Sequence, residues 1–141
     1  MIARRWPVRS EFFAPLPIAA LALLVTNDLW LKPLFHNALT GKLSDVAVCF
    51  LMPLFLSELL GIAFAWPAGR RLRVAAVVTA VIFTALEVVP PVTRWALAGL
   101  SAVGPFLGIA GRFRMTTDWT DLCCLLLIPL AVRYGDKRLA Q

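Results

Sequence analysis

The residues best suited to chemistry in this chain belong to a short pattern that occurs twice. Ser44-Asp45-Val46 precedes Pro53 in the first copy. Thr120-Asp121-Leu122 precedes Pro129 in the second copy, and each member of the pattern is shifted by 76 residues. A hydroxyl beside a carboxylate can bind a cation, exchange a proton or cap a helix. The recurrence indicates a tandem duplication.

A second pair of acids supports the duplication. An apolar run precedes each copy and carries one acid near its end, Asp28 in the first run and Glu87 in the second. Four carboxylates therefore occupy two pairs of equivalent positions. An ionisable group inside an apolar span costs about 2.5–3.5 kcal/mol on insertion scales, so we expect Asp28 and Glu87 to serve a function or an obligatory polar network.

The composition indicates an integral membrane protein. Of 141 residues, 60% are hydrophobic and only 16% are charged, which is more apolar surface than a small soluble domain can bury. A helix that spans the hydrocarbon core needs about 20 mainly apolar residues. Four segments meet this requirement, at 14–31, 45–66, 72–91 and 119–134. A fifth apolar stretch, Trp95 to Ala110, is shorter and is interrupted by Gly104-Pro105, so we predict that it is re-entrant or interfacial.

We therefore predict a single all-α transmembrane domain over residues 1–141, with four transmembrane helices arranged as a tandem repeat of two helix pairs. The first repeat covers about 14–66 and the second about 72–135. The spacing between the two acids is about 17 residues longer in the second repeat, which matches an insertion at 95–111 between the third and fourth helices. Pro90-Pro91 is expected to end the third helix.

The distribution of Lys and Arg predicts the orientation. With four spans, nine cations lie on the side of the two termini and five on the other side. The tight cluster Arg70-Arg71-Arg73, between the second and third spans, belongs to the majority side. Both termini are thus expected in the cytoplasm. The net charge of +6 is then explained by contact with the anionic surface of the lipid bilayer, and a nucleic-acid partner is not required to explain it.

This arrangement is expected to bring the acids together in the outer third of the bilayer. A helix rises about 1.5 Å per residue, so Asp28 and Glu87 lie roughly 20 Å beyond the cytoplasmic ends of their spans. Asp45 and Asp121 open the returning spans. The predicted ligand-binding site consists of Asp28, His36, Asp45, Glu87, Arg112, Asp118 and Asp121.

Several of these residues also have a simpler structural interpretation. A side-chain oxygen at a helix start satisfies unpaired N–H groups and suits the positive end of the helix dipole. The candidate N-caps are therefore Ser44 or Asp45 in the first copy, and Thr117, Asp118, Thr120 or Asp121 in the second. A single interfacial histidine such as His36 is more often solvated than a ligand.

Glu58 and Arg133 form a separate candidate pair. Glu58 lies 13 residues after Asp45, and Arg133 lies 12 residues after Asp121, so both fall at the same depth if the repeats pack side by side. We predict a structural ion pair, because an unpaired charge at that depth is costly. The alternative is that Glu58 stays protonated and the Arg133 side chain extends to the cytoplasmic interface.

The second half of the chain has a distinctive order of polar residues. From Val81 to Gly135, an apolar helix with an embedded Glu87 is followed by Gly111-Arg112 and then by Asp118 and Asp121, which open a last helix. This order resembles the second half of the VanZ-like membrane proteins. The resemblance implies that Glu87, Arg112 and Asp121 are the shared polar positions. It implies a bacterial inner-membrane protein of the cell envelope, in a family associated with glycopeptide antibiotic tolerance.

Three functions fit these observations. In the first, the outer polar site binds a polar head group or the lipid-linked phosphate of an envelope precursor, with a divalent cation as a possible cofactor because carboxylates suit Mg²⁺ and Ca²⁺. In the second, a structural or assembly protein has no ligand of its own. In the third, the acids carry protons or cations through a small transporter, which would be a homo-oligomer because four short helices enclose little volume. The chain has no GxSxG, HExxH or P-loop motif, and whether it is an enzyme stays open.

Overall fold

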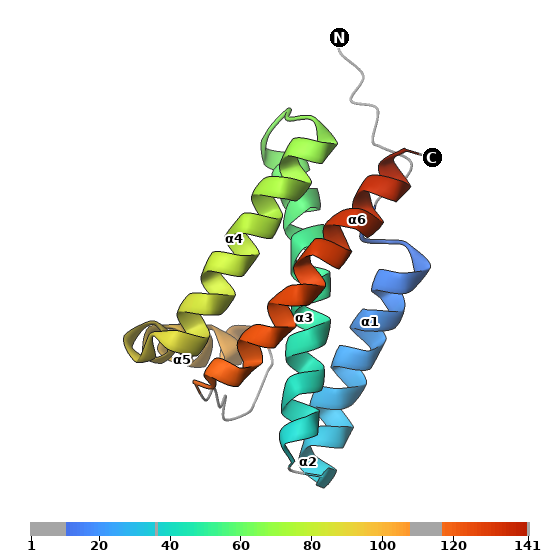
Figure 1. The fold of residues 1–141 in the computed structure, drawn as a ribbon. Helices are drawn as coiled ribbons and strands as arrows, with labels where there is room; N and C mark the ends of the chain where they lie inside the picture. Colours follow the sequence, from blue (N-terminus) through green and yellow to red (C-terminus); the bar gives the residue numbers. More distant parts are fainter. Residues whose placement is uncertain (1–10, 36, 108–116, 141) are drawn as a thin grey trace. The chain divides into compact units, whose positions relative to one another are not determined.

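The computed structural model describes residues 11–35, 37–107 and 117–140 (Figure 1). All regular elements within these ranges are helical, as predicted. In chain order they are α1 (Pro15–Thr26), the π-helical turn η1 (Asn27–Leu31), α2 (Lys32–Phe35), α3 (Ala38–Ala63), α4 (Ala68–Val88), α5 (Pro90–Val103), the 3-10 helices η2 (Gly104–Leu107) and η3 (Trp119–Leu126), and α6 (Leu127–Leu139).

The chain divides into two compact units. Unit 1 comprises residues 1–80 and 124–141, and unit 2 comprises residues 81–123. Helices α1, α3 and α6 and the first part of α4 therefore belong to unit 1. The end of α4 belongs to unit 2 together with α5.

Two helices are long and apolar enough to cross a membrane. The first is the continuous helix Pro15–Phe35, with 21 residues, and the second is Leu39–Ala63, with 25 residues. A third candidate exists if Ala68–Val88 and Pro90–Phe106 count as one broken span. The structure thus supports a membrane protein with two or three candidate spans, and the predicted four spans and tandem repeat are not confirmed.

The last predicted span illustrates why the number is lower. The segment predicted at 119–134 is divided between the 3-10 helix η3 and the α-helix α6. The final turns of α6 also carry Arg133, Asp136, Lys137 and Arg138. A change of helix type and a charged end leave too few consecutive apolar residues in one helix to span the hydrocarbon core.

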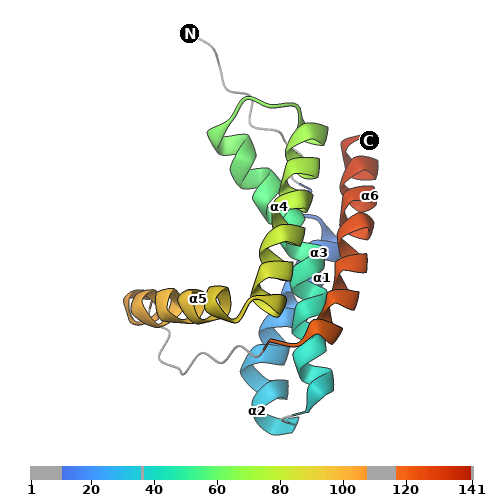
Figure 2. The same ribbon diagram turned by 60° about the vertical axis from the view of Figure 1, so that its left-hand side comes forward.

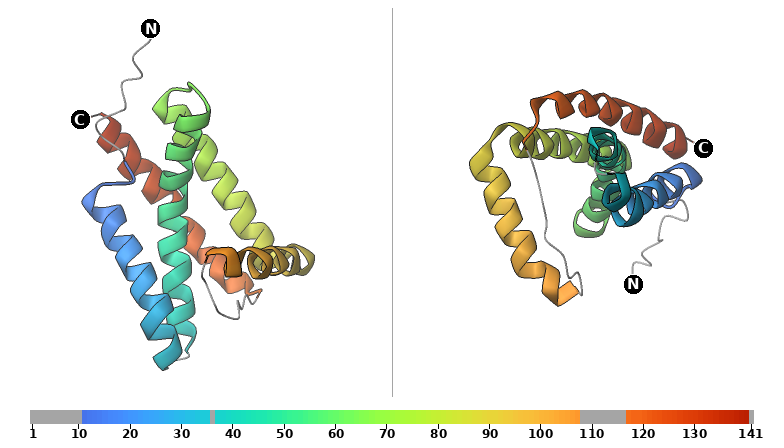
Figure 3. Two further views of the ribbon diagram at one scale, coloured as in Figure 1. Left: turned by 180° about the vertical axis from the view of Figure 1, so that it is seen from behind. Right: turned by 90° about the horizontal axis from the view of Figure 1, so that it is seen from below.

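The core of unit 1 is formed where α3 lies between α1 and α6 (Figures 1 and 3). Leu54 of α3 and Leu72 of α4 are completely buried there. Helix α6 approaches them through small residues, because Ala131 is buried in the same cluster and a Cβ added to Gly135 would lie 2.6 Å from a Leu72 methyl group. Close approach through small residues is the usual way in which helices pack inside membranes.

The outward faces of unit 1 and of α4 are apolar. Helix α1 exposes Leu16, Ile18, Leu21, Leu23 and Val25, and α4 exposes Val77, Val78, Val81 and Ile82. A soluble domain rarely exposes such a continuous apolar surface. Helices that are apolar on all sides are typical of membrane spans.

A proline pair opens α5 directly after Val89, the one residue between α4 and α5. Helix α5 begins at Pro90, and the two helices are bent by 104° (Figure 2). Proline has no N–H, so the Leu86 carbonyl loses the donor that a continuous helix would provide four residues later. The buried Thr93 replaces that donor, since its Oγ1 lies 2.6 Å from the Leu86 oxygen. The prediction that Pro90-Pro91 ends the preceding helix is confirmed.

Candidate functional site

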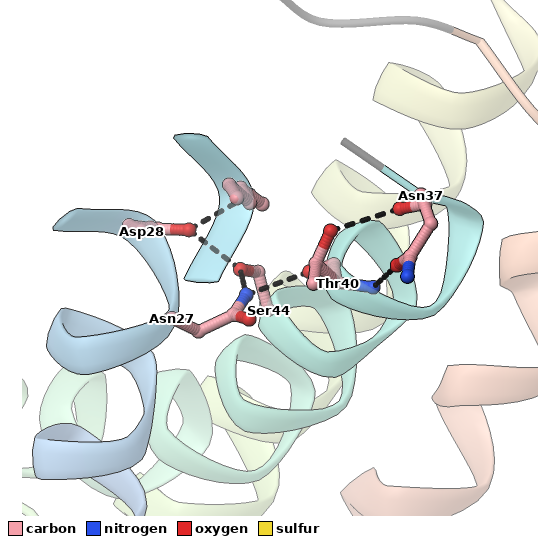
Figure 4. Close-up of polar contacts among 6 residues, drawn as sticks. Asn27, Asp28, Asn37, Thr40 and Ser44 are labelled. Carbon is pink, nitrogen blue, oxygen red and sulfur yellow. Dashed lines mark hydrogen bonds and ion pairs between the residues drawn. The ribbon is translucent and has the colours of Figure 1, made fainter. Parts of the chain in front are cut away.

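The clearest polar cluster of unit 1 joins the end of α1 to the start of α3 (Figure 4). Asn27 is completely buried, and its Nδ2 donates to the Thr40 carbonyl at 2.6 Å and to Ser44 Oγ at 2.8 Å. The Ser44 hydroxyl donates in turn to Asp28 Oδ1 at 2.6 Å. The same carboxylate oxygen pairs with Lys32 Nζ at 2.7 Å. We call these five residues the polar relay.

The π-helical turn η1 positions two members of the polar relay. The N–H of Lys32 donates to the carbonyl of Asn27, five residues earlier. Pro33 follows at once and offers no N–H for a regular α-helical bond. Single π-turns inside helices occur frequently at functional sites. Here the turn leaves Asn27 buried against α3, whereas the Asp28 and Lys32 side chains are 46% and 41% exposed.

The start of α3 differs from the predicted start at residue 45. Helix α3 begins at Ala38, and Asn37 is its N-cap because its side-chain oxygen accepts from the N–H of Thr40 at 3.0 Å. Asp45 therefore lies within α3, and the interpretation of Ser44 or Asp45 as the N-cap is wrong. The sequence signal was present, because asparagine is a preferred N-cap residue.

In unit 2, the embedded acid of α4 meets the start of η3. Glu87 Oε2 accepts a hydrogen bond from the backbone N–H of Asp118 at 3.0 Å. Asp118 Oδ1 in turn accepts from the N–H and the hydroxyl of Thr120, at 2.9 Å and 2.7 Å. Asp118 thus caps this helix, as one of the N-cap predictions stated. Asp121 lies in the first turn.

Each unit therefore links a helix acid to the segment that carries the repeated motif. Asp28 bonds with Ser44, the neighbour of Asp45, and Glu87 bonds with Asp118, close to Asp121. Asp28 and Asp45 belong to unit 1 and the other three acids to unit 2, and the convergence of all of them into one site stays a prediction. His36 and Arg112 lie outside the described residues. The members of the polar relay that the predicted site did not include are Asn27, Lys32, Thr40 and Ser44.

Glu58 lies near the other end of α3 and contacts the segment before α1. Its Oε1 accepts a hydrogen bond from the backbone N–H of Glu11 at 3.0 Å. Arg133 on α6 is exposed. Glu58 thus contacts Glu11, and the ion pair between Glu58 and Arg133 stays a prediction.

The metal prediction concerns the same acids. Within the described ranges, no three His, Cys, Asp or Glu side chains gather as the ligands of a metal ion would. A bound divalent cation stays a prediction. The charged pair formed by Asp28 and Lys32 instead offers one anionic and one cationic group to a ligand.

No family model, no curated protein and no solved structure matches this chain. The class that the structure defines is a helical protein with two or three helices able to cross a membrane, judged by length and composition. The resemblance to the VanZ-like proteins stays a hypothesis that rests on residues 81–135.

Proposed function

We propose that this protein is a multi-pass membrane protein whose polar relay binds the polar head group of a phospholipid. The observation that carries the proposal is the ion pair between Asp28 and Lys32, which is exposed at the end of an apolar helix. Ser44 holds the pair in place by donating a hydrogen bond to Asp28, and the buried Asn27 donates to Ser44 in turn. A fixed pair of opposite charges at this position suits a ligand that itself carries both charges.

The depth of the pair agrees with a head-group ligand. Asp28 follows Pro15 by 13 residues, which corresponds to about 20 Å along the helix, and Lys32 lies about 6 Å further. In a core about 30 Å thick, these side chains reach the boundary with the head groups. The lysine stem can lie along apolar surface while its ammonium stays in that boundary.

The chemistry of the pair favours a zwitterionic head group such as that of phosphatidylethanolamine. Its phosphate can pair with Lys32 and its ammonium with Asp28, so one internal ion pair is exchanged for two pairs with the ligand. The Ser44 hydroxyl keeps Asp28 oriented during the exchange, because it donates to the same carboxylate oxygen. Hydrogen bonds to charged groups are about twice as strong as neutral ones.

The orientation of the protein in the membrane and its resemblance to the VanZ-like proteins form part of the same proposal. We place the polar relay on the periplasmic side of a bacterial inner membrane, with four spans and both termini in the cytoplasm, and the asymmetry of Lys and Arg supports this. Glu11 before α1 and Asp136 near the end of α6 interact electrostatically, which supports a common side for the two ends of the bundle. The contact of Glu87 with Asp118 supports a functional role for the VanZ-like stretch.

A structural role without a ligand is the second candidate. It is favoured by the direct hydrogen bonds through which Asn27 ties α1 to α3. In that case the ion pair between Asp28 and Lys32 would only neutralise a carboxylate near the membrane. The two candidates differ in what happens when the charges are removed but the buried Asn27 is kept.

Retention of phospholipid by purified protein tests the proposal. We expect Asp28→Asn and Lys32→Gln each to lower the retention of phosphatidylethanolamine about tenfold, which corresponds to about 1.4 kcal/mol. The exposed Lys137 is the matched control, and Lys137→Gln should leave retention unchanged. Native mass spectrometry of the protein released from nanodiscs measures the bound lipid. Equal retention in all three variants would contradict the head-group proposal.

The double variant D28K/K32D separates the two candidates further. It preserves an i, i+4 pair of opposite charges but exchanges their positions. A purely structural pair predicts that lipid retention equals that of the wild type, although stability falls because the Ser44 hydroxyl loses its carboxylate acceptor. A head-group site predicts that retention stays low, because the anion and the cation no longer match the ligand.

A further inference from the structure

A second polar cluster lies near the end of α3, where the segment before α1 packs against it. Glu11 is only 3% exposed, and its N–H donates to Glu58 Oε1 at 3.0 Å. The next residue, Phe12, packs its ring against Phe55, with the ring centroids 5.4 Å apart. Residues 11 and 12 are therefore docked on the last turns of α3.

Buried polar atoms in this cluster are not satisfied by hydrogen bonds. Glu11 Oε2 and Arg71 Nε are buried and have no hydrogen-bond partner among the described residues. Ser57 is completely inaccessible. Burial of an ionised carboxylate without such partners is costly, and the usual remedy is protonation.

The charges that face Glu11 come from all three neighbouring helices. Helix α3 contributes Glu58, α4 contributes Arg71 and α6 contributes Asp136. The Arg71 guanidinium lies against Gly61 of α3, where an added Cβ would collide with it. Among the described residues, the carboxyl groups of Glu58 and Asp136 and the guanidinium of Arg71 act on Glu11, and a proton on Glu11 reduces the negative charge that these carboxyl groups share with it.

The pKa of Glu11 agrees with this balance. Burial and then the negative charge of Glu58 raise the pKa of Glu11 from 4.5 to about 7. The charge of Arg71 and the hydroxyl of Ser57 oppose the rise, whereas Asp136 adds to it. Glu11 lies outside the candidate spans, close to their entrance, so its carboxyl can exchange protons with the aqueous side.

We propose that Glu11 and Glu58 form a proton-binding site that fastens the segment before α1 to the end of α3. A proton from water adds to a carboxylate oxygen of Glu11, and the new O–H bond removes the repulsion between the two carboxylates. Loss of that proton to water restores two negative charges in a buried site and weakens the docking of residues 11 and 12. The site is independent of the head-group proposal, since it lies at the other end of α3.

The direction of the pH effect follows from the pKa. The docked carboxyl has a higher pKa than the same carboxyl in water, so docking is strongest below about pH 4.5 and weakens as the pH rises through about 7. Between pH 5 and pH 8 the docking equilibrium should fall by about 70-fold. A carboxyl stabilised as an anion would show the opposite dependence.

Hydrogen exchange of the peptide that contains residues 11–14 tests the proposal on the full chain in nanodiscs. After correction for intrinsic exchange, protection in the wild type should fall by about 70-fold between pH 5 and pH 8. Glu11→Gln keeps the size of the side chain without a titrating charge, so its protection should not change with pH. Glu87→Gln, which removes a carboxyl of unit 2, should behave as the wild type. An equal pH dependence in Glu11→Gln and the wild type would overturn the proposal.

Infrared difference spectra of the wild type provide a second measurement that does not depend on the folding of a variant. The protonated carboxyl of Glu11 should give a C=O band that is present at pH 5 and lost with a midpoint near pH 7. Glu58→Gln removes the neighbouring charge but keeps an oxygen that can accept from the Glu11 N–H, and it should move the midpoint to lower pH. The absence of any carboxyl band that titrates between pH 6 and pH 8 would also overturn the proposal.

Discussion

Removal of the Asn27 side chain tests the polar relay most directly. Asn27→Ala deletes both donors of a completely buried amide, one to the Thr40 carbonyl and one to Ser44 Oγ. Hydrogen bonds between membrane helices contribute about 0.6 kcal/mol on average and up to about 1.7 kcal/mol. Two short bonds therefore predict a loss of about 1–3 kcal/mol in the free energy of unfolding.

The bond between Asn27 and Ser44 can be isolated with a double-mutant cycle. Ser44→Ala removes one acceptor of Asn27 and also the donor to Asp28, so its own cost should be about 1–2 kcal/mol. Because the two residues share a hydrogen bond, the double variant should lose less than the sum of the single variants, by about 0.6–1.7 kcal/mol.

Tryptophan fluorescence during unfolding by sodium dodecyl sulfate is a suitable assay, since the chain contains 5 tryptophans. Thr79→Ala is the matched control, because the Thr79 hydroxyl donates only to the Ala75 carbonyl within α4. Its effect should add to that of Asn27→Ala without coupling. Strict additivity between Asn27→Ala and Ser44→Ala would refute the reasoning, because it would mean that the bond contributes nothing to the fold.

Two further predictions concern the core and the topology. Leu54→Ala empties a completely buried position and should cost about 2.7–5 kcal/mol, whereas Val81→Ala, at a site that is 63% exposed, should change the free energy of unfolding little in the same assay. A reporter that is active only in the cytoplasm should be active when it is fused after Gln141, because both termini are predicted in the cytoplasm. Activity of a periplasm-specific reporter at the same position would contradict this topology.

The helices could be predicted from the sequence more reliably than their ends. The apolar runs at 14–31 and 45–66 correspond to the two candidate spans Pro15–Phe35 and Leu39–Ala63. The first was predicted to end at residue 31, but the helix continues through the π-helical turn η1 and α2 to Phe35. Hydrophobicity averaged over a window identifies a span, whereas its ends depend on single hydrogen bonds.

The contacts of single residues in the candidate site were also harder to predict from the sequence than the helices themselves. The predicted site grouped Asp28 with Asp45, and in the structure Asp28 accepts a hydrogen bond from the hydroxyl of Ser44, the residue before Asp45. The start of α3 at Ala38 sets which side chains face α1, and one residue changes the direction by about 100°. Glu11 could not be predicted, because it lies outside every apolar segment and 47 residues from Glu58.

The bend at Pro90 has a consequence for the shape that this protein imposes on a bilayer. If α4 follows the membrane normal, a bend of 104° places α5 about 14° from the membrane plane, with the apolar rings of Trp95 and Phe106 exposed. A helix of 14 residues is about 21 Å long and about 10 Å wide, so it occupies an area on the order of 200 Å². The helix would occupy that area in one leaflet of the bilayer only. Helices that lie in one leaflet are sensitive to curvature. The bend between α4 and α5 therefore favours a membrane that is convex on the side on which α5 lies.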